Sequence, residues 1–472
     1  MSVSAEPSES PVPADVPADV PSDDAVAAGD VAAAGANVID ELRWRGLIAI
    51  STDEEELRAA LGAGPVTYYA GFDPTAPSLH IGSLVQILTL RRLQQAGHRP
   101  LALVGGATGL IGDPKPTAER SLNAPEVVAG WVERMRSQIE PFLDFTGPNP
   151  ATMVNNLDWT SGLSAIDFLR DVGKHFRVNK MLAKEAVSAR LNSDSGISYT
   201  EFSYQILQAL DFLELNRRYG CSLQIGGSDQ WGNLTAGTDL IHRVQGTPVH
   251  ALATPLITKA DGTKFGKTEG GTVWLDPAMT TPYAFFQFWV NAEDAKVAEY
   301  LKIFTFRTEA EIKDLADLVV ARPGARQAQR TLARDVTSMV HGPQVAQRVE
   351  QASQALFGAA ELRDLDPETL RDALAELPLI QLPRGSHPVI DLLVGTGLSA
   401  SRSAARRTLQ EGGAYINNVK VTAQTEPTGA AGGTSSGAGL DSVAIGPADL
   451  LHDRWLLLRR GRRALAAVEL IA

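Results

Sequence analysis

The sequence has 472 residues, of which 44% are hydrophobic and 21% are charged; this is typical of a globular protein and excludes a fibrous or wholly disordered chain. Its single cysteine, Cys221, excludes an internal disulfide and any zinc site built from several cysteines. No apolar run is long enough to span a membrane, and the N-terminus lacks the basic start and apolar stretch of a signal peptide, so we expect a cytoplasmic protein.

The net charge of −12 is unevenly distributed along the chain. Residues 1–40 hold eight acidic side chains and no Lys or Arg, so the rest of the chain carries only −4. From Gln381 onward, ten basic residues stand against seven acidic ones. The charge therefore does not exclude a nucleic-acid partner. Residues 1–37 are rich in Pro and Ala and contain no aromatic side chain, which predicts a disordered acidic tail.

Short β-rich runs alternate with amphipathic helices over residues 38–276. This alternation predicts an α/β domain of Rossmann-like type, with a parallel sheet wrapped by helices. We expect its strands at Val66–Phe72, Pro100–Val104, Thr152–Asn155 and Ser222–Ile225. Ligands of such sheets bind beyond the carboxyl ends of the strands, so the loops that follow these strands are the candidate sites.

The loop after the first strand leads into an apolar-periodic helix that begins near Ser83 and stops at Gly97. His80, Gly82 and Ser83 therefore stand at a helix N-terminus, where free backbone N–H groups and the helix dipole favour phosphate. A histidine at this point can also simply cap the helix. On this stretch alone, capping is the better-supported interpretation.

The glycine-rich run Gly105–Gly112 follows the next strand and superficially matches a dinucleotide fingerprint. Its glycine spacing does not fit G-x-G-x-x-G, and no long helix opens directly after it. We therefore reject that motif.

The predicted helix over residues 200–219 carries Tyr204, Gln208 and Asp211 at positions i, i+4 and i+7, so the three project from one face. This face either is solvated or lines a polar pocket, and the apolar residues on the rest of the helix favour the pocket. The following segment, Gln224–Asn233, is again a strand, a glycine turn and a polar cluster. Its Asp229 is placed like an acceptor for ribose hydroxyls.

Lys264, Lys267 and Thr268 lie in a glycine-containing loop. The loop has three residues between its glycines where a P-loop needs four, and no helix follows, so it is not a P-loop. It is either an exposed basic turn or a loop that closes over a nucleotide and places two positive charges on its phosphates.

Residues 277–376 are predicted to form a helical domain, followed by a proline-containing linker over 377–388. The last domain, residues 389–472, has a helix with Arg402, Arg406 and Arg407, then β-like pieces separated by a Gly/Ser-rich insert at 422–440 that we expect to be a flexible loop.

As a set, these motifs resemble those of a known family. His80-Ile81-Gly82-Ser83 and Lys264-Phe265-Gly266-Lys267-Thr268, in this order on a parallel-sheet domain, are similar to the two signatures of class I aminoacyl-tRNA synthetases. The stretch Tyr69–Thr75, the Gly105–Asp113 run, the Tyr204/Gln208/Asp211 row and Gln224–Asn233 narrow the resemblance to the bacterial tyrosyl-tRNA synthetases. The last domain is similar to the S4-like α+β RNA-binding domain of that family.

The resemblance implies a role for each matching residue. Tyr69 and Asp211 would bind the phenol oxygen of tyrosine; Asp113, Tyr204 and Gln208 would hold its ammonium group, and Gln230 would lie near its carboxylate. On the ATP side, Asp73, Asp229 and the backbone of Gly71 and Gly227 would face the adenosine, with Gly82 and Ser83 in the same site. Thr75, His80, Lys264, Lys267 and Thr268 would stabilise the phosphates during catalysis, and Lys267 would also bind ATP.

The resemblance further implies a tyrosine–tRNA ligase that uses ATP with Mg²⁺, has no dedicated metal site, and acts as a homodimer. Its helical domain and the S4-like domain, through Arg402, Arg406 and Arg407, would bind the tyrosine tRNA. Two departures stand out: Ser83 replaces the final His or Asn of the first signature, and Ala70 stands where some members have a cysteine. A tryptophan-specific synthetase and an inactive RNA-binding scaffold remain as alternatives.

Overall fold

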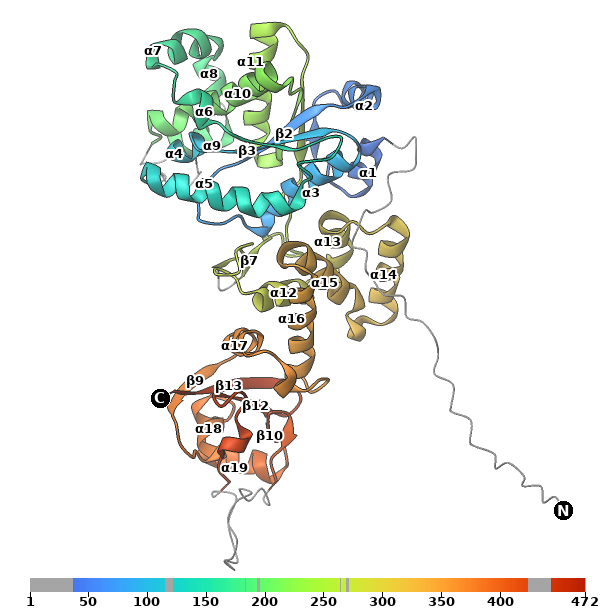
Figure 1. The fold of residues 1–472 in the computed structure, drawn as a ribbon, viewed down its shortest axis with the longest axis vertical. Helices are drawn as coiled ribbons and strands as arrows, with labels where there is room; N and C mark the ends of the chain where they lie inside the picture. Colours follow the sequence, from blue (N-terminus) through green and yellow to red (C-terminus); the bar gives the residue numbers. More distant parts are fainter. Residues whose placement is uncertain are drawn as a thin grey trace, which may run out of the picture.

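The computed structural model describes residues 37–114, 122–182, 184–192, 196–263, 265–268, 271–422 and 443–471. The predicted tail (apart from residue 37), Lys264 and the insert (apart from residue 422) lie outside this range, as do the side chains of Lys267 and Thr268. The described chain forms three units that follow one another along the long axis of the molecule (Figure 1).

The first unit is built on a sheet in the order β1-β6-β5-β2-β3-β4. The strands are β1 (Ile50–Ser51), β2 (Thr67–Phe72), β3 (Arg99–Val104), β4 (Thr152–Asn155), β5 (Leu223–Gly227) and β6 (His250–Thr254). All neighbouring pairs are parallel except β1 and β6, which are antiparallel. The predicted parallel α/β sheet is confirmed, but the sequence did not indicate the parallel strand β6 or the antiparallel edge strand β1.

Helices pack on both faces of this sheet (Figure 1). The helices of this unit are α1 (Val38–Trp44), α2 (Glu54–Ala63), α3 (Ile81–Gln95), α4 (Thr108–Ile111), α5 (Pro125–Ile139), α6 (Leu157–Thr160), α7 (Ala165–Asp167), α8 (Val178–Leu182), α9 (Glu185–Leu191), α10 (Tyr199–Tyr219) and α11 (Trp231–Gln245). The long helix α10 begins at the N-cap Ser198 and ends at Gly220, which has a positive φ of 63° that glycine adopts without strain.

The helical unit follows, as expected from the sequence. It contains α12 (Pro282–Val290), α13 (Val297–Phe304), α14 (Glu309–Ala321), α15 (Gln327–His341), α16 (Pro343–Leu356) and α17 (Pro367–Ala375). Two buried arginines join it to the first unit. Arg45 donates to the carbonyl oxygen of Lys302 (2.9 Å), and Arg92 of α3 donates to that of Thr305 (2.7 Å), so the unsatisfied carbonyls at the end of α13 are paired.

The last unit is a five-stranded sheet in the order β11-β10-β12-β13-β9, with two helices. Its elements are β9 (Leu379–Pro383), α18 (Val389–Gly395), α19 (Arg402–Gln410), β10 (Ala414–Ile416), β11 (Val419–Lys420), β12 (Trp455–Arg460) and β13 (Ala464–Ile471). The stretch 377–388 is therefore not a plain linker, because β9 pairs in parallel with β13. Its two flanking prolines are tolerated because β9 is an edge strand.

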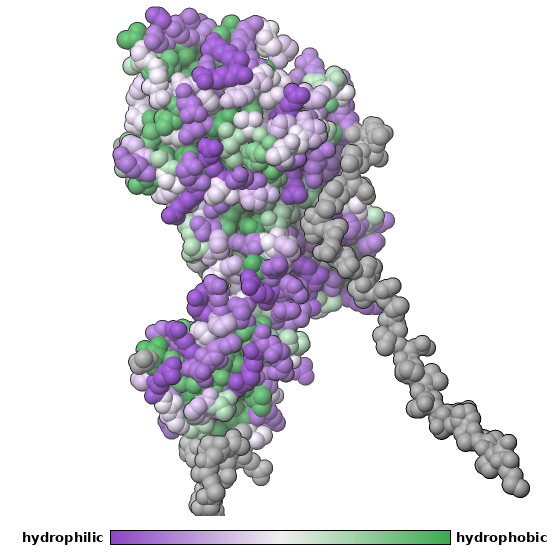
Figure 2. All heavy atoms as spheres, viewed as in Figure 1, coloured by the Kyte–Doolittle hydropathy of each residue, from purple (hydrophilic) through white to green (hydrophobic). Residues whose placement is uncertain are grey.

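Hydrophilic side chains crowd the junction between the helical unit and the last unit on the face drawn in Figure 2. In the part of the chain that the structure describes, no helix is long and apolar enough to cross a membrane.

Candidate active site

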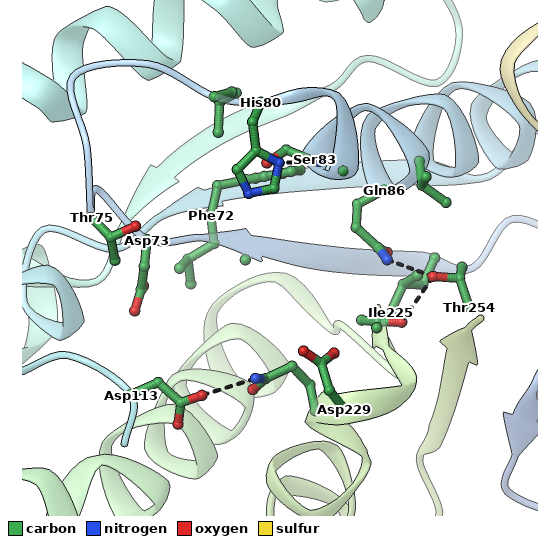
Figure 3. Close-up of a pocket in the computed structure, with 18 of the residues that line it drawn as sticks. Phe72, Asp73, Thr75, His80, Ser83, Gln86, Asp113, Ile225, Asp229 and Thr254 are labelled. Carbon is green, nitrogen blue, oxygen red and sulfur yellow. Dashed lines mark hydrogen bonds between the residues drawn. The ribbon is translucent and has the colours of Figure 1, made fainter. Parts of the chain in front are cut away.

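A cavity of about 360 Å³ opens at the carboxyl ends of β2 and β5, beside the N-terminus of α3 (Figure 3). It brings together every described residue that the sequence assigned to tyrosine or ATP, apart from those of the lysine loop. These residues are Tyr69, Gly71, Asp73, Thr75, His80, Gly82, Ser83, Asp113, Tyr204, Gln208, Asp211, Gly227, Asp229 and Gln230.

His80 is the N-cap of α3, and its Nδ1 accepts a hydrogen bond from the Ser83 backbone N–H at 3.3 Å. Its imidazole also points into the cavity (Figure 3). A β-carbon on Gly82 would lie 2.8 Å from Cε1 of this ring, so only glycine leaves the ring its place. His80 can therefore cap α3 and also face a phosphate. The hydrogen bond that Ser83 donates comes from its backbone, so it does not depend on the side chain at this position.

Asp211 lies at the buried end of the cavity, with 2% of its surface exposed. One carboxylate oxygen accepts from Asn156 Nδ2 at 3.0 Å, and the other accepts from Trp159 Nε1 at 2.9 Å. Burial raises the pKa of Asp211 to about 7 against these two hydrogen bonds, which lower it. Sequence reasoning missed Asn156 and Trp159, although both follow β4, where such a sheet places its ligand-binding loops.

The Tyr69 hydroxyl is buried, and it has no hydrogen-bond partner among the residues that the structure describes. Burial, and next the nearby Asp211 carboxylate, raise the pKa of Tyr69 far above its usual range. The amide oxygen of Gln208 also lacks a partner within the described part of the chain. Unpaired buried polar atoms destabilise a protein, and here they line a cavity, which indicates that a polar ligand completes them.

Asp73 accepts two short hydrogen bonds, from the Tyr204 hydroxyl at 2.7 Å and from Thr108 Oγ1 at 2.6 Å. Tyr204 thus directs its proton to Asp73, leaving its oxygen lone pairs for other donors. A β-carbon on Gly105 would lie 2.1 Å from Asp73 Oδ1. The glycine run rejected as a dinucleotide fingerprint therefore has another use, because it lets this carboxylate lie against the backbone after β3.

Asp113 is held by two amides of the segment that follows β5. Its Oδ2 accepts from Gln230 Nε2 at 2.9 Å, and its Oδ1 accepts from Asn233 Nδ2 at 3.3 Å (the dashed line at Asp113 in Figure 3 is the first of these). Asn233 also donates to Gln230 Oε1 at 2.7 Å. Asn233 was not among the predicted site residues.

The rest of the cavity lining comes from α3, the ends of β5 and β6 and the segment after β6, and it includes the large side chains of Leu256 and Trp274. Gln86 of α3 donates to Thr254 Oγ1 at 2.6 Å, which ties α3 to the end of β6. Asp229 projects into the cavity from the turn after β5 (Figure 3). A β-carbon on Gly227 would lie 2.6 Å from Asp229 Oδ1, so this glycine makes room for the carboxylate.

The lysine loop adjoins the start of α3. Its residues Lys267–Thr268 form β7, which pairs with β8 (Gly271–Thr272). The Val273 backbone then links the two signatures, because its N–H donates to Gly266 O at 3.0 Å and its carbonyl accepts from the Ile81 N–H at 3.2 Å. Gly266 has a φ of 84° and packs on Ile81, which restricts this position to glycine.

The predicted RNA-binding arginines lie far from this cavity along the chain, on α19 of the last unit (Figure 1). Arg402 forms an ion pair with Asp391 of α18, and both side chains are largely exposed. Arg407 lies in the last turn of the same helix.

Known proteins resemble this chain over most of its length. Residues 62–358 match the family described as class I tRNA synthetases (W and Y), and residues 369–430 match the SYY-like C-terminal domain of tyrosine–tRNA ligases. The chain is 65% identical to a tyrosine–tRNA ligase of Streptomyces avermitilis over 92% of this chain and 99% of that protein. It is 61% identical to that of Acidothermus cellulolyticus, with the same coverage of both proteins.

Among solved structures, a C-terminally truncated mitochondrial tyrosyl-tRNA synthetase of Aspergillus nidulans superposes with a TM-score of 0.62 at 29% identity, covering 68% of this chain and 94% of that one. A tryptophanyl-tRNA synthetase of Encephalitozoon cuniculi, 15% identical, superposes with a TM-score of 0.51 over 70% of this chain and 89% of its own, which shows a shared fold alone. The chain therefore belongs to the tyrosine–tRNA ligases of the class I tRNA synthetase family.

Proposed function

We propose that the protein activates L-tyrosine with ATP and then transfers tyrosine to the 3′ end of its tRNA. In the first step, a carboxylate oxygen of tyrosine forms a bond to the α-phosphorus of ATP, and the bond from that phosphorus to the departing pyrophosphate breaks. In the second, a terminal ribose hydroxyl of the tRNA attacks the carbonyl carbon, loses its proton and releases AMP. Neither step needs a protein nucleophile, so catalysis consists of positioning and charge stabilisation.

The observation that carries this proposal is the pair of Tyr69 and Asp211 at the buried end of the cavity. Asp211 has both oxygens directed by Asn156 and Trp159, and Tyr69 has an unpaired hydroxyl. A tyrosine ring placed here puts its own hydroxyl between an acceptor and a donor. Phenylalanine would leave the Tyr69 hydroxyl without a partner and would offer Asp211 no further donor, and tryptophan presents a single N–H donor on a larger ring.

The ammonium and carboxylate of tyrosine then contact polar side chains that line the cavity further from its buried end. The acceptors for the ammonium are the Asp113 carboxylate, the Tyr204 oxygen and the Gln208 amide oxygen, which has no partner among the described residues. Gln230, fixed on Asp113, lies near the carboxylate. These groups orient the attacking oxygen toward the nucleotide end of the cavity.

ATP occupies the end of the cavity built by the first signature. The backbones of Gly71 and Gly227 admit the adenosine closely, with Asp73 and Asp229 as hydroxyl acceptors. His80, Thr75 and the start of α3 meet the phosphates, and the lysine loop adds Lys264, Lys267 and Thr268. Mg²⁺ would arrive bound to the phosphates of ATP.

The experiment that tests this proposal is ATP–pyrophosphate exchange, measured with each amino acid in turn. We expect exchange with tyrosine and at most a trace with phenylalanine or tryptophan. Exchange supported best by tryptophan would establish the tryptophan-specific alternative. Loss of exchange with all amino acids, in a protein that still binds tRNA, would establish the inactive scaffold.

The RNA-binding role of the last unit has its own test. Replacing Arg402, Arg406 and Arg407 together by Ala in the full chain removes three positive charges from α19, more than 300 residues along the chain from His80. We expect about tenfold or greater loss of tRNA charging at physiological salt, with exchange unchanged. The matched control is Arg43→Ala, an exposed arginine on α1 of the first unit, which should alter neither reaction. Unimpaired charging by the triple variant would refute the assignment.

The protein acts as a homodimer in this proposal, within the cytoplasm where tRNA is charged. The support is a run of exposed apolar side chains in one segment of the first unit. They are Leu157, Ile166, Leu169, Val178 and Leu182, which are 37–68% exposed. We expect light scattering to give the mass of two chains for the wild type and of one chain for Ile166→Asp with Leu169→Asp; a monomeric wild type would contradict the proposal.

A further inference from the structure

Lys184 lies directly before α9, outside every motif described so far. Its ammonium donates a hydrogen bond to the side-chain oxygen of Asn233. Burial lowers the pKa of Lys184 to about 8, and the Asp113 carboxylate opposes that shift, so the side chain is mostly charged at neutral pH. An ammonium group has three donors and no acceptor. The amide of Asn233 therefore has to turn its oxygen toward Lys184.

This orientation fixes the rest of the network. With its oxygen on Lys184, Asn233 points its NH₂ group at Gln230 Oε1 (2.7 Å) and at Asp113 Oδ1 (3.3 Å). Gln230 then has its own NH₂ group toward Asp113 Oδ2 (2.9 Å). An ionised carboxylate can only accept. The chain of bonds thus runs in one direction, from a group that can only donate, through two amides, to a group that can only accept.

The backbone around Asn233 is shaped to receive the lysine. A β-carbon on Gly232 would lie 2.9 Å from Cε of Lys184, so the side chain lies against the bare backbone of this glycine. Lys184, Gly232 and Asn233 line a second cavity of about 280 Å³, which shares Asp113 and Asp229 with the first. Lys184 thus approaches the residues of the proposed tyrosine site from the second cavity.

We propose that Lys184 is a positioning residue for tyrosine: by fixing the orientation of the Asn233 amide, it holds Gln230 and Asp113 as the binding groups for the amino-acid end of the substrate. This inference rests on the proposed tyrosine site and adds a residue to it. Without the cation, the Asn233 oxygen loses its donor, and only Gln230 Oε1 and Asp113 still orient this amide. Gln230 and Asp113 would then be held less firmly for the carboxylate and ammonium of tyrosine.

The first test is Lys184→Met, which keeps an unbranched side chain only one atom shorter and removes its donors. In tyrosine-dependent exchange we expect the KM for tyrosine to rise about tenfold or more, with the KM for ATP within about twofold. Lys184→Arg, also a pure donor, should recover most of the loss. The matched control is Lys180→Met, an exposed lysine on the preceding helix, which should leave both constants unchanged.

A second variant separates positioning from mere anchoring of α9. Asn233→Asp offers Lys184 a full carboxylate and so keeps or strengthens the anchor, but it cannot donate to Gln230 or Asp113. We expect the same selective rise in the KM for tyrosine as in Lys184→Met. If Lys184→Met does not fold, Asn233→Asp decides the matter alone.

Two results would overturn the inference. One is an Asn233→Asp enzyme with a normal KM for tyrosine, because the direction of the hydrogen bonds would then be irrelevant. The other is an equal rise in both KM values in Lys184→Met, because the lysine would then only support the fold. Either result leaves the proposed function intact provided that Asp113→Asn still raises the KM for tyrosine, whereas a normal Asp113→Asn enzyme would remove the proposed ammonium site itself.

Discussion

The two ends of the cavity are built in different ways. At the proposed tyrosine end, side chains from separate strands and helices are hydrogen-bonded to one another: Asp211 to Asn156 and Trp159, and Asp113 to Gln230 and Asn233. At the proposed phosphate end, the described groups include the N-terminus of α3 and its cap His80. In the proposed function, the positive charges at this end come from the lysines of the loop that includes β7.

This difference follows from what each end has to do. Tyrosine differs from phenylalanine by one hydroxyl. The tyrosine end therefore needs rigid, buried groups that form hydrogen bonds with this hydroxyl and cannot form them with phenylalanine. ATP takes part whichever amino acid is activated, so this end does not have to select it. The negative charge on its phosphates needs stabilisation mainly in the transition state, as pyrophosphate departs. Fixed geometry therefore serves selection, and groups on a loop serve the transition state.

The largest effect should come from the phosphate end. We expect Lys267→Ala to slow the formation of tyrosyl-adenylate about 10²- to 10³-fold while the Kd for tyrosine stays within about twofold. Single-turnover kinetics and equilibrium binding separate the two quantities. Lys259→Ala, in the segment that precedes the loop, is the control and should change neither. If the rate of adenylate formation and the affinity for tyrosine fell by the same factor, Lys267 would not act mainly in the transition state.

A smaller effect is expected from Tyr69→Phe at the tyrosine end. Removing this hydroxyl should lower kcat/KM for tyrosine about tenfold and leave that for phenylalanine unchanged, because only tyrosine loses a hydrogen bond. Tyr68→Phe is a close control, since the neighbouring hydroxyl is equally buried but donates to the Leu90 carbonyl on the other face of β2. If Tyr69→Phe still preferred tyrosine over phenylalanine as strongly as the wild type, groups other than Tyr69 would have to recognise the substrate hydroxyl.

The smallest effect concerns stability and pH. The pKa of Asp211 is raised to about 7, so between pH of about 4 and 7 the folded protein keeps a proton that the unfolded chain has lost. The contribution of Asp211 to stability is therefore highest at low pH and falls as the pH rises through 7. We expect the melting temperature of Asp211→Asn, relative to the wild type, to rise by several degrees between pH 5 and pH 8. If the melting temperatures of the two proteins changed with pH in the same way, the raised pKa of Asp211 would be contradicted.

Much of the fold and of the cavity lining was accessible from the sequence, because both follow from local pattern. The row of Tyr204, Gln208 and Asp211 is set by helical spacing, and His80 by its place between a strand and a helix. The expected strands at β2, β3, β4 and β5 agree with the structure to within two residues at either end.

What could not be predicted depends on contacts between distant segments. Asn156 and Trp159 acquire a role only because β4 and α10 bring them to Asp211, and Lys184 only because α11 presents Asn233. β9 was missed because its proline-flanked sequence is typical of a linker, and its partner β13 lies more than 80 residues further on. Single-sequence periodicity contains no information on such pairings.

The unpaired hydroxyl of Tyr69 also makes tyrosine a folding ligand. The empty protein carries a buried donor and an amide oxygen that nothing in its described residues satisfies, so the bound state is favoured by more than the contacts of the ring alone. Saturation with tyrosine at about 100 times its Kd would add about 2.7 kcal/mol to the free energy of unfolding. Tyrosine at this concentration should therefore also protect the protein against unfolding.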